Sequence, residues 1–231
     1  MHKVFLFTVV TMCAMLVSCT QPAAQTEEKE YMEDSFFSDV EGLHIACNLA
    51  KYGYKTGSPS ALIEAADIFA FLDPWDFDAA AEKGPDNANE TEKVENVQFH
   101  PEQLIADARE LTDDPYLLAI ADKVLAELNS EILPCGARSG ANYAYGRVSA
   151  RSYMCYDLTC YASRIAEVSV VGDGDTDLDL YIYDEDDHLI ASATDYTDDC
   201  FVRLYPRRTA LYRVKIVNRG GVYNNYVIAV N

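Results

Sequence analysis

Hydrophobic residues recur at two different periods along this chain of 231 residues. From Phe36 to Leu133 apolar residues return every three or four positions, which predicts amphipathic helices. From Gly136 onward apolar and polar residues alternate, and Tyr, Val, Ile and Thr become frequent, which predicts strands. The pattern therefore predicts a two-domain α+β protein, with a small helical bundle over residues 36–134 and an antiparallel β-sandwich over residues 140–231.

Prolines mark the starts of the predicted helices. Pro59, Pro74, Pro101 and Pro115 each follow a Ser, Asp or His. Proline fits the first helical position because its missing N–H has no intrahelical partner there, and a Ser or Asp before it can cap the helix. We therefore expect helices to begin at these four prolines.

Two of the predicted helices repeat one pattern. SPSALIEAADIF at 58–69 and HPEQLIADAREL at 100–111 share a proline, a Leu-Ile pair and an alanine at matching positions. The apolar stripes that result are Leu62, Ile63, Ala66 and Phe69, and Leu104, Ile105, Ala108 and Leu111. Two copies are too few for a solenoid, so the repeat predicts a bundle, with residues 83–96 as a polar, mobile loop. Such a bundle serves either as a partner-binding groove or as a packing platform.

Eight short strands are predicted in the second half. They cover residues 143–150, 152–157, 164–171, 178–183, 188–194, 200–205, 210–218 and 223–230. Short strands at close, regular spacing are typical of a sandwich or a barrel.

The stretch GDGDTDLDLYIYDEDDHL at 172–189 carries an Asp at every second position where a strand begins. A period of two places Leu178, Leu180 and Ile182 on the inner face of the sheet. The same period places Asp177 and Asp179 on the outer, wet face.

Seven aspartates are candidates for one cation site. If this strand pairs with the next in a hairpin, the loops before and after the pair lie at the same end. The aspartates of these loops and of the strand start are Asp173, Asp175, Asp177, Asp179, Asp195, Asp198 and Asp199. Carboxylates that converge from two loops suit Ca²⁺, which takes six to eight oxygen ligands. An EF-hand is excluded because Leu178 stands where that loop needs Gly, and the alternative to calcium is a solvated acidic rim.

Three stretches of the second half resemble a known family. DLDLYIYDEDDHLIAS, PRRTALYRVKIVN and YNNYVIAV resemble, in order and spacing, the bacterial pre-peptidase C-terminal domain, most specifically in DxDLY at 177–181 and YxVxI at 212–216. The resemblance covers the chain from Tyr145 onward. It implies a jelly-roll-like sandwich of the kind appended to secreted enzymes, with related modules that bind calcium and matrix polymers. The family favours Gly in the turn where Asp187 stands, and Asp tolerates a left-handed backbone there.

The N-terminal residues predict export and lipidation. A basic start, an apolar run and the sequence LVSC ending at Cys19 resemble the signal of bacterial lipoproteins. Residues 1–18 are therefore predicted to be a signal peptide, with Cys19 carrying the lipid that holds the protein to the bilayer at the bacterial cell envelope. The polar residues 19–35 are predicted to be a flexible tether. An ordinary signal peptide with an incidental Cys is the alternative.

Charge and cysteines narrow the possible partners. The formal net charge is −20, which disfavours nucleic acid as a partner. Residues 173–199 hold eleven Asp or Glu and no Lys or Arg, whereas residues 200–231 hold six Lys or Arg and no acidic residue, so neutralisation across neighbouring strands is expected. Cys47 is expected to be a buried apolar residue. The remaining mature cysteines are Cys135, Cys155, Cys160 and Cys200. These four residues can form disulfides in three alternative pairings.

Catalytic patterns are weak in this sequence. The mature histidines are dispersed: His44, His100 and His188. Ser139 in GARSG stands one residue away from a nucleophile elbow. His44 and Cys47 share a helical face, either as a Cys–His pair or as buried packing. Trp75 either anchors a helix junction or marks a ligand contact.

These features predict a non-catalytic envelope lipoprotein that acts as a binding or scaffolding module. Calcium is the expected stabilising ion, and an envelope protein or a glycan is the expected partner. The alternative function is an accessory or relic subunit of a secreted peptidase system.

Overall fold

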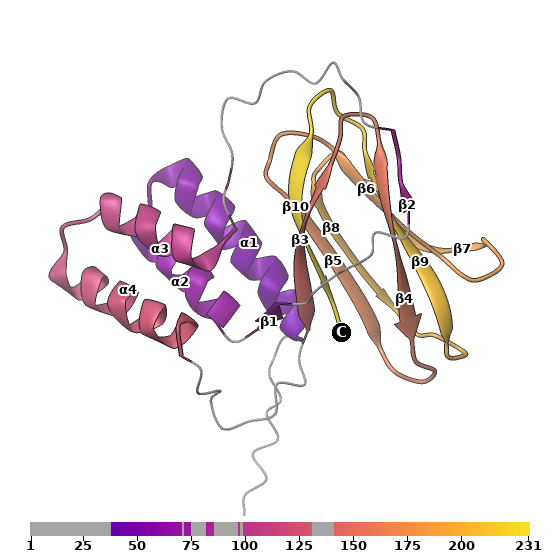
Figure 1. Ribbon diagram of the computed structural model, residues 1–231, viewed down its shortest axis with the longest axis horizontal. Coiled ribbons are helices and arrows are strands. Elements are labelled where there is room, and N and C mark those ends of the chain that lie inside the picture. The colour runs from indigo at the N-terminus through magenta and orange to yellow at the C-terminus, as the bar shows by residue number, and fades with distance from the viewer. Residues whose placement is uncertain (1–37, 71, 75–81, 86–96, 98, 131–140) are drawn as a thin grey trace, which may run out of the picture. The chain divides into compact units, whose positions relative to one another are not determined.

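The computed structural model describes residues 38–70, 72–74, 82–85, 97, 99–130 and 141–231 (Figure 1). The residues from Ser35 to Asn231 form one compact unit. The predicted signal peptide, the tether, Cys19 and Trp75 lie outside the described residues, so they stay predictions, as do the domain boundaries. Within the described ranges, no helix is long and apolar enough to cross a membrane.

Four helices form the first part of the described chain. They are α1 (Asp39–Thr56), α2 (Pro59–Ala70), α3 (Pro101–Glu110) and α4 (Pro115–Leu128). Helix α1 starts with a capping box: the Ser38 hydroxyl accepts from the Glu41 N–H at 3.1 Å, and the Glu41 carboxylate accepts from the Ser38 N–H at 3.0 Å. These two bonds satisfy backbone donors that the helix itself leaves without partners.

Three of the four expected proline starts are confirmed, at Pro59, Pro101 and Pro115. The expectation for Pro74 is wrong, because Asp73–Pro74 forms the short strand β1, which runs parallel to strand β3 (Asn142–Val148). A proline is tolerated there since β1 is an edge strand, where a missing N–H breaks no ladder.

The two predicted apolar stripes are buried, except at one position. Every member of the α2 stripe is at most 3% exposed, and helices α2 and α3 pack against each other. Leu111 is 47% exposed, so its expected burial is wrong. The reason is that α3 ends at Glu110 and Leu111 is its C-terminal cap residue, past the buried face.

Ten strands form two five-stranded sheets. Sheet A contains, in spatial order, β1, β3, β10 (Asn224–Val230), β5 (Ala166–Gly172) and β8 (Asp199–Leu204). Sheet B contains β2 (Glu82–Lys83), β4 (Tyr153–Cys160), β9 (Ala210–Asn218), β6 (Leu178–Tyr183) and β7 (Leu189–Ala193). All neighbouring strands except β1 and β3 are antiparallel.

The eight predicted strands are confirmed as β3 to β10. From β3 onward the chain changes sheet at every connection except the β6–β7 hairpin, which is the crossing pattern of a jelly-roll-like sandwich. Strand β2 was not expected, since it contains Lys83 of the predicted loop 83–96. Residues 86–96 of that loop lie outside the described residues. The α+β fold class is therefore confirmed.

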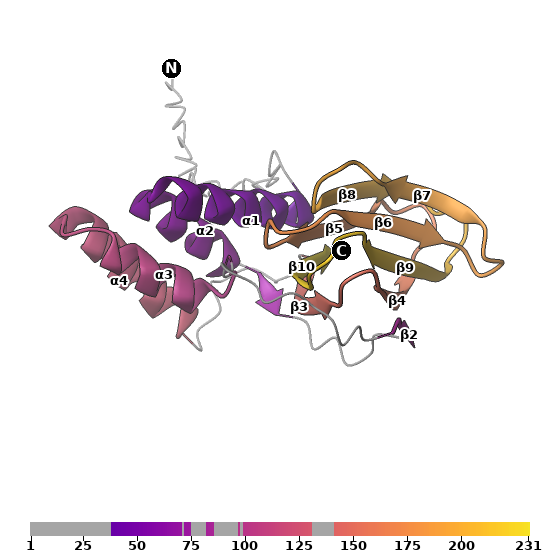
Figure 2. The same ribbon diagram turned by 90° about the horizontal axis from the view of Figure 1, so that it is seen from above.

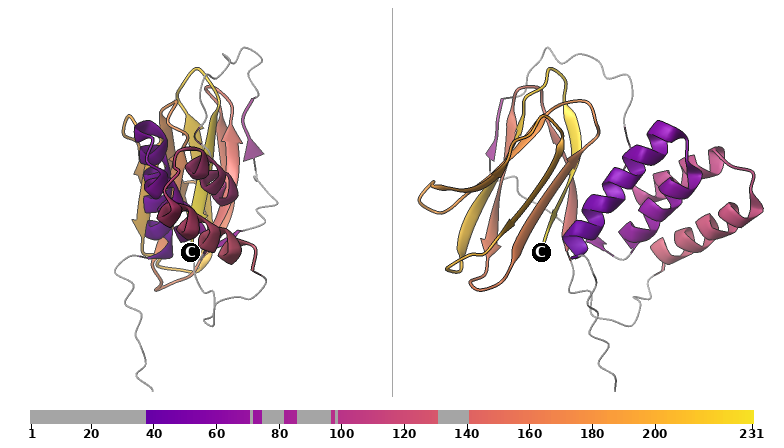
Figure 3. Two further views of the ribbon diagram at one scale, coloured as in Figure 1. Left: turned by 90° about the vertical axis from the view of Figure 1, so that its left-hand side faces the viewer. Right: turned by 180° about the vertical axis from the view of Figure 1, so that it is seen from behind.

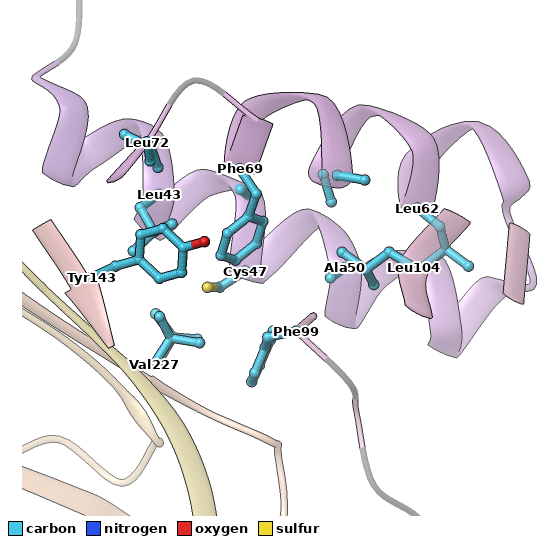
Figure 4. Packing of buried hydrophobic residues seen from close by; sticks show 14 of the residues in the cluster. Leu43, Cys47, Ala50, Leu62, Phe69, Leu72, Phe99, Leu104, Tyr143 and Val227 are labelled. Atoms are coloured by element: carbon cyan, nitrogen blue, oxygen red, sulfur yellow. The ribbon is translucent and has the colours of Figure 1, made fainter. Parts of the chain in front are cut away.

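The helices cover one face of the sandwich (Figure 2, Figure 3). One hydrophobic cluster fills the space between the two sheets, and it includes Leu178, Leu180 and Ile182, as the alternation predicts. A second cluster joins the helices to the outer face of sheet A, where Tyr143 and Val227 pack toward α1 (Figure 4). Helix α1 thus lies along β5 and β10.

Candidate functional site

The two acidic loops meet at one end of the sandwich, as the predicted hairpin requires. Strand β6 pairs with β7, and the Leu178 N–H donates to the Thr197 carbonyl at 2.9 Å. The Gly172 N–H donates to the Asp198 carbonyl at 2.7 Å. Between the loops lies a hollow of about 550 Å³, named here the acidic hollow, whose wall includes Lys51, Asp175, Asp177, Tyr196, Asp198 and Asp199.

Helix α1 places three polar side chains against this end of the sandwich. Lys51 Nζ donates to Asp198 Oδ1 at 2.6 Å, and Asn48 Nδ2 donates to Asp199 Oδ2 at 2.6 Å. His44 Nε2 lies 2.8 Å from Asp199 Oδ1. Positions 44, 48 and 51 share one helix face, so α1 docks through a polar stripe beside its apolar one.

The carboxylate of Asp199 is held in its ionised form by this stripe. Burial by itself would raise its pKa, but the hydrogen bonds from His44 and Asn48 and the positive charges of His44 and Lys51 keep the pKa below its usual value. Asp198 is 6% exposed and also accepts from the Gly174 N–H. Both aspartates therefore serve in docking α1.

Asp177 also lines the hollow. Among the described residues, its Oδ1 atom is buried without a hydrogen-bond partner, as is Oδ1 of Asp199, which however lies 2.8 Å from His44 Nε2. Burial raises the pKa of the Asp177 carboxyl, and the neighbouring charge of Asp179 raises it further. A buried carboxylate oxygen without a donor costs free energy, which an added donor or a cation would offset.

The remaining three candidate aspartates do not line the acidic hollow. Asp173 accepts from the Asn225 N–H at 2.9 Å. Asp179 pairs with Arg219 and accepts from the Tyr181 hydroxyl at 2.9 Å. The last of them, Asp195, accepts from the Thr197 hydroxyl at 2.7 Å.

The expectation that Asp179 lies on the wet face is wrong in its exposure, and two further candidates are buried as well. Asp173, Asp179 and Asp198 are at most 6% exposed. The alternation assigned Asp179 to the outer face of the sheet correctly, but the Arg219 side chain lies on it there. Partners that are distant in the sequence therefore cover these aspartates.

One cluster with metal-ligand spacing was missed by the sequence analysis. It is found in the β6–β7 turn and consists of Asp184, Asp186 and His188. The ligand atoms of these three residues lie within 4.8 Å of one another, and no other such group occurs in the described ranges. Asp184 already accepts from the backbone N–H groups of the other two residues, so hydrogen bonding within the turn explains the cluster. The spacing D-x-D-x-H is the signal that would have found it.

The expected charge neutralisation is confirmed around the same turn. Arg208 pairs with Glu185 at 2.9 Å, and Arg213 pairs with Asp187 at 3.0 Å. Asp187 has φ +59°, the left-handed conformation expected where the related family favours Gly.

The fold brings a Ser, a His and an Asp together. His44 Nδ1 lies 2.8 Å from Ser169 Oγ, and His44 Nε2 lies 2.8 Å from Asp199. The Asp199 carboxylate only accepts, so His44 donates from Nε2, and the order Ser–His–Asp is that of a catalytic triad. Ser169 is however 1% exposed beneath α1, so no substrate reaches its hydroxyl.

The cysteines that the structure describes are also buried. Cys47 is fully buried, as expected, and burial raises the pKa of its thiol well above the usual value. Cys155, Cys160 and Cys200 are buried and unpaired. Cys135 and Ser139 lie outside the described residues, so any disulfide with Cys135 stays untested.

Comparisons with known proteins assign no family. No protein-family model and no curated protein matches the chain. The pre-peptidase C-terminal domain of a Bacillus anthracis collagenase is 12% identical, with 38% of this chain and 87% of that one covered and a TM-score of 0.30. A periplasmic inhibitor of g-type lysozyme from Aeromonas hydrophila is 13% identical, with 39% and 84% covered and a TM-score of 0.31.

A carbohydrate-binding module, CBM36, in complex with calcium and xylotriose is 12% identical, with 37% of this chain and 76% of that one covered and a TM-score of 0.26. At these identities and TM-scores, the matches assign neither a family nor a function. The fold itself defines the class: an α+β protein whose helices pack on one sheet of a β-sandwich.

Proposed function

We propose that this chain is a non-catalytic binding and scaffolding module of the bacterial cell envelope, anchored through lipidated Cys19 and stabilised by calcium in the acidic hollow. The observation that carries the proposal is the convergence of two acidic loops on one hollow, with a buried oxygen of Asp177 that no protein donor satisfies. An envelope protein or a glycan is the proposed partner.

The chemistry of the hollow supports calcium. Asp175 and Asp177 line the hollow and offer hard oxygen ligands, which Ca²⁺ prefers, whereas the two oxygens of Asp198 are engaged by Lys51 and by the Gly174 N–H. Asp199 and Asp179 are engaged by α1 and by Arg219, so we assign them to holding the loops in place. Asp173 and Asp195 have the same supporting role through their bonds to Asn225 and Thr197.

The buried position of Ser169 supports a non-catalytic role. Among the described residues, Ser169 is the serine that forms a Ser–His–Asp arrangement, and helix α1 covers its hydroxyl. A catalytic use would require α1 to leave the sheet, with loss of the packing around Tyr143 and Val227. Binding needs no such opening.

Thermal unfolding tests the calcium proposal. We expect the melting temperature to rise by about 5–10 °C when calcium is about one hundred times above its dissociation constant, because a ligand of the folded state stabilises it by about 2.7 kcal/mol. Asp177→Asn should reduce this rise to about half or less, because a tenfold weaker site is stabilised by only about 1.4 kcal/mol at the same calcium concentration, whereas Asp186→Asn, in the β6–β7 turn, should keep it. A melting temperature that does not respond to calcium or to chelator would refute the proposal.

Asp177→Asn should also stabilise the calcium-free protein at neutral pH. A carboxyl whose pKa is raised by folding costs stability once the pH exceeds that pKa, and the neutral amide removes this cost.

A pull-down from envelope extract, with and without calcium, tests the proposed partner. A secreted peptidase that co-purifies would favour the accessory-subunit alternative instead.

A further inference from the structure

The outer face of sheet B, on the side of the sandwich away from the helices, carries three tyrosines (Figure 1). Strands β4, β9 and β6 are neighbours there, and alternation points Tyr153, Tyr181 and Tyr183 outward, since the residues beside them belong to the inner cluster. A cavity of about 160 Å³ lies between Tyr153 and Tyr183, and we name it the sheet B pocket. Its wall includes Glu82, Tyr153, Tyr183, Asp187, Arg213 and Lys215.

The polar side chains of the pocket wall contact one another. The Tyr153 hydroxyl donates to the Glu82 carboxylate at 2.6 Å, and Arg213 Nη1 donates to Asp187 Oδ1 at 3.0 Å. Lys215 Nζ lies 4.3 Å from the centre of the Tyr153 ring. These contacts restrict the wall side chains before a ligand binds, which lowers the entropy cost of binding.

The charges of the pocket wall are balanced. Glu82 and Asp187 are acidic, and Arg213 and Lys215 are basic. The β6–β7 turn beside the pocket holds further acidic residues, which are engaged by backbone N–H groups of the turn or by Arg208: Asp184, Glu185 and Asp186. An anionic ligand would meet these carboxylates, and a cationic ligand would meet the two basic side chains. The pocket therefore favours an uncharged ligand.

Rings and charged groups together select the kind of uncharged ligand. An apolar ligand would cover the charged side chains without replacing their hydrogen bonds to water, which costs free energy. A sugar ring instead has a face of C–H groups that packs on an aromatic ring, and a rim of hydroxyls that each donate and accept. Glu82 and Asp187 can accept from such hydroxyls, and Arg213 and Lys215 can donate to them. The cavity has the volume of about five water molecules, which is the size of one such ring.

We propose that the sheet B pocket binds a neutral glycan, with one sugar ring against Tyr183 and its hydroxyls bonded to the charged wall residues. The Tyr181 and Tyr183 rings have centres 6.3 Å apart and planes inclined by 27°, so Tyr181 continues the aromatic surface along β6 beyond the pocket. This inference rests on the binding role of the proposed function and names the surface that takes a glycan partner. It does not involve the acidic hollow.

NMR titration of the backbone amides of the purified protein, with cellotriose and with chitotriose, tests the site. We expect at least one of these neutral probes to give saturable shifts at residues 153–155, 181–183 and 213–215, with a dissociation constant of about 1 mM or lower. The amides of residues 174–177 and 196–199, at the acidic hollow, should not shift. The proposal is overturned if neither probe shifts the pocket amides, or if trigalacturonate, which is anionic, binds there as tightly.

Matched variants test the role of the Tyr183 ring. Tyr183→Ala should weaken binding of the probe about tenfold or more, a loss of about 1.4 kcal/mol. Tyr183→Phe keeps the ring and should bind as the wild type does. Tyr116→Ala, at a 72% exposed tyrosine of α4, is the control for loss of an exposed ring elsewhere. Unchanged binding by Tyr183→Ala, or equal weakening by Tyr183→Phe, would overturn the stacking on this ring.

Calcium titration of the same samples separates this inference from the calcium site. Calcium binding without sugar binding refutes only the glycan site, and sugar binding without calcium binding refutes only the calcium site.

Discussion

The aspartates of residues 173–199 have different roles because their neighbours differ. Asp198 and Asp199 bind the polar stripe of α1, and Asp179 binds Arg219. Asp177 keeps an oxygen without a donor. Asp179, Asp198 and Asp199 are thus engaged by α1 or by Arg219, which leaves Asp177 as a residue that we propose as a calcium ligand.

The stabilising role of Asp199 predicts a pH dependence. The pKa of Asp199 in the folded protein lies below the ordinary Asp value of about 3.9 that applies to the unfolded chain. The ionised carboxylate therefore contributes stability above about pH 4, and this contribution is lost as the pH falls through the lower, folded-state pKa. We expect the difference in unfolding free energy between the wild type and Asp199→Asn to shrink as the pH falls below about 4.

Urea unfolding from pH 7 to pH 3 measures this difference. Asp195→Asn, an exposed residue of the same loop, is the control and should show a small difference throughout. A difference in unfolding free energy between the wild type and Asp199→Asn that does not change with pH would contradict the stabilising role of the Asp199 carboxylate.

Residue roles could be predicted from the sequence only where they depend on local pattern. The left-handed backbone of Asp187 follows from its turn, and the burial of Leu178, Leu180 and Ile182 follows from alternation. The burial of Asp179 does not, because Arg219 is forty positions away.

Among the helices and strands, the site depends most on how α1 docks on sheet A. Its apolar stripe packs on sheet A, and its polar stripe reaches the loop before β8. The sequence signal for this docking is the set of polar residues His44, Asn48 and Lys51 on a helix otherwise rich in buried residues. The helical period alone does not reveal which element faces that stripe.

Lys51→Met should weaken this docking. The change keeps much of the aliphatic stem but leaves the nearly buried Asp198 without its ammonium partner. We expect a loss of about 1–3 kcal/mol in the free energy of unfolding, measured by urea denaturation. Lys55→Met, at an exposed position in the last turn of α1, is the matched control. Equal effects of the two substitutions would show that the ion pair does not support the fold.

The boundaries of helices and strands were predictable where the hydrophobic period and the turn or proline residues indicate the same boundary. Strands β6 and β9 have the expected bounds, and three helices begin at the expected prolines. The prediction of a helix start at Pro74 was wrong because Asp-Pro suits an edge strand as well as a helix start. Whether a strand forms there depends on pairing with Tyr143, which is far along the chain.

At the scale of the described unit, the two ends of the sandwich differ in chemistry. The acidic hollow occupies one end, and the β6–β7 turn, whose carboxylates pair with Arg208 and Arg213, occupies the other. Charge counts along the sequence indicated an acidic and a basic segment, and the hairpin predicted the convergence of the acidic loops. Which side chains stay exposed depends on helix docking and on ion pairs between strands, which sequence periodicity does not encode.

Isothermal titration calorimetry of the purified protein with CaCl₂ tests the central claim most directly. We predict saturable binding of calcium to one site, weakened about tenfold or more by Asp177→Asn, a loss of about 1.4 kcal/mol in binding free energy. Asp186→Asn should bind as the wild type does. The absence of saturable binding, or equal binding by Asp177→Asn, would contradict the assignment of the acidic hollow as a calcium site.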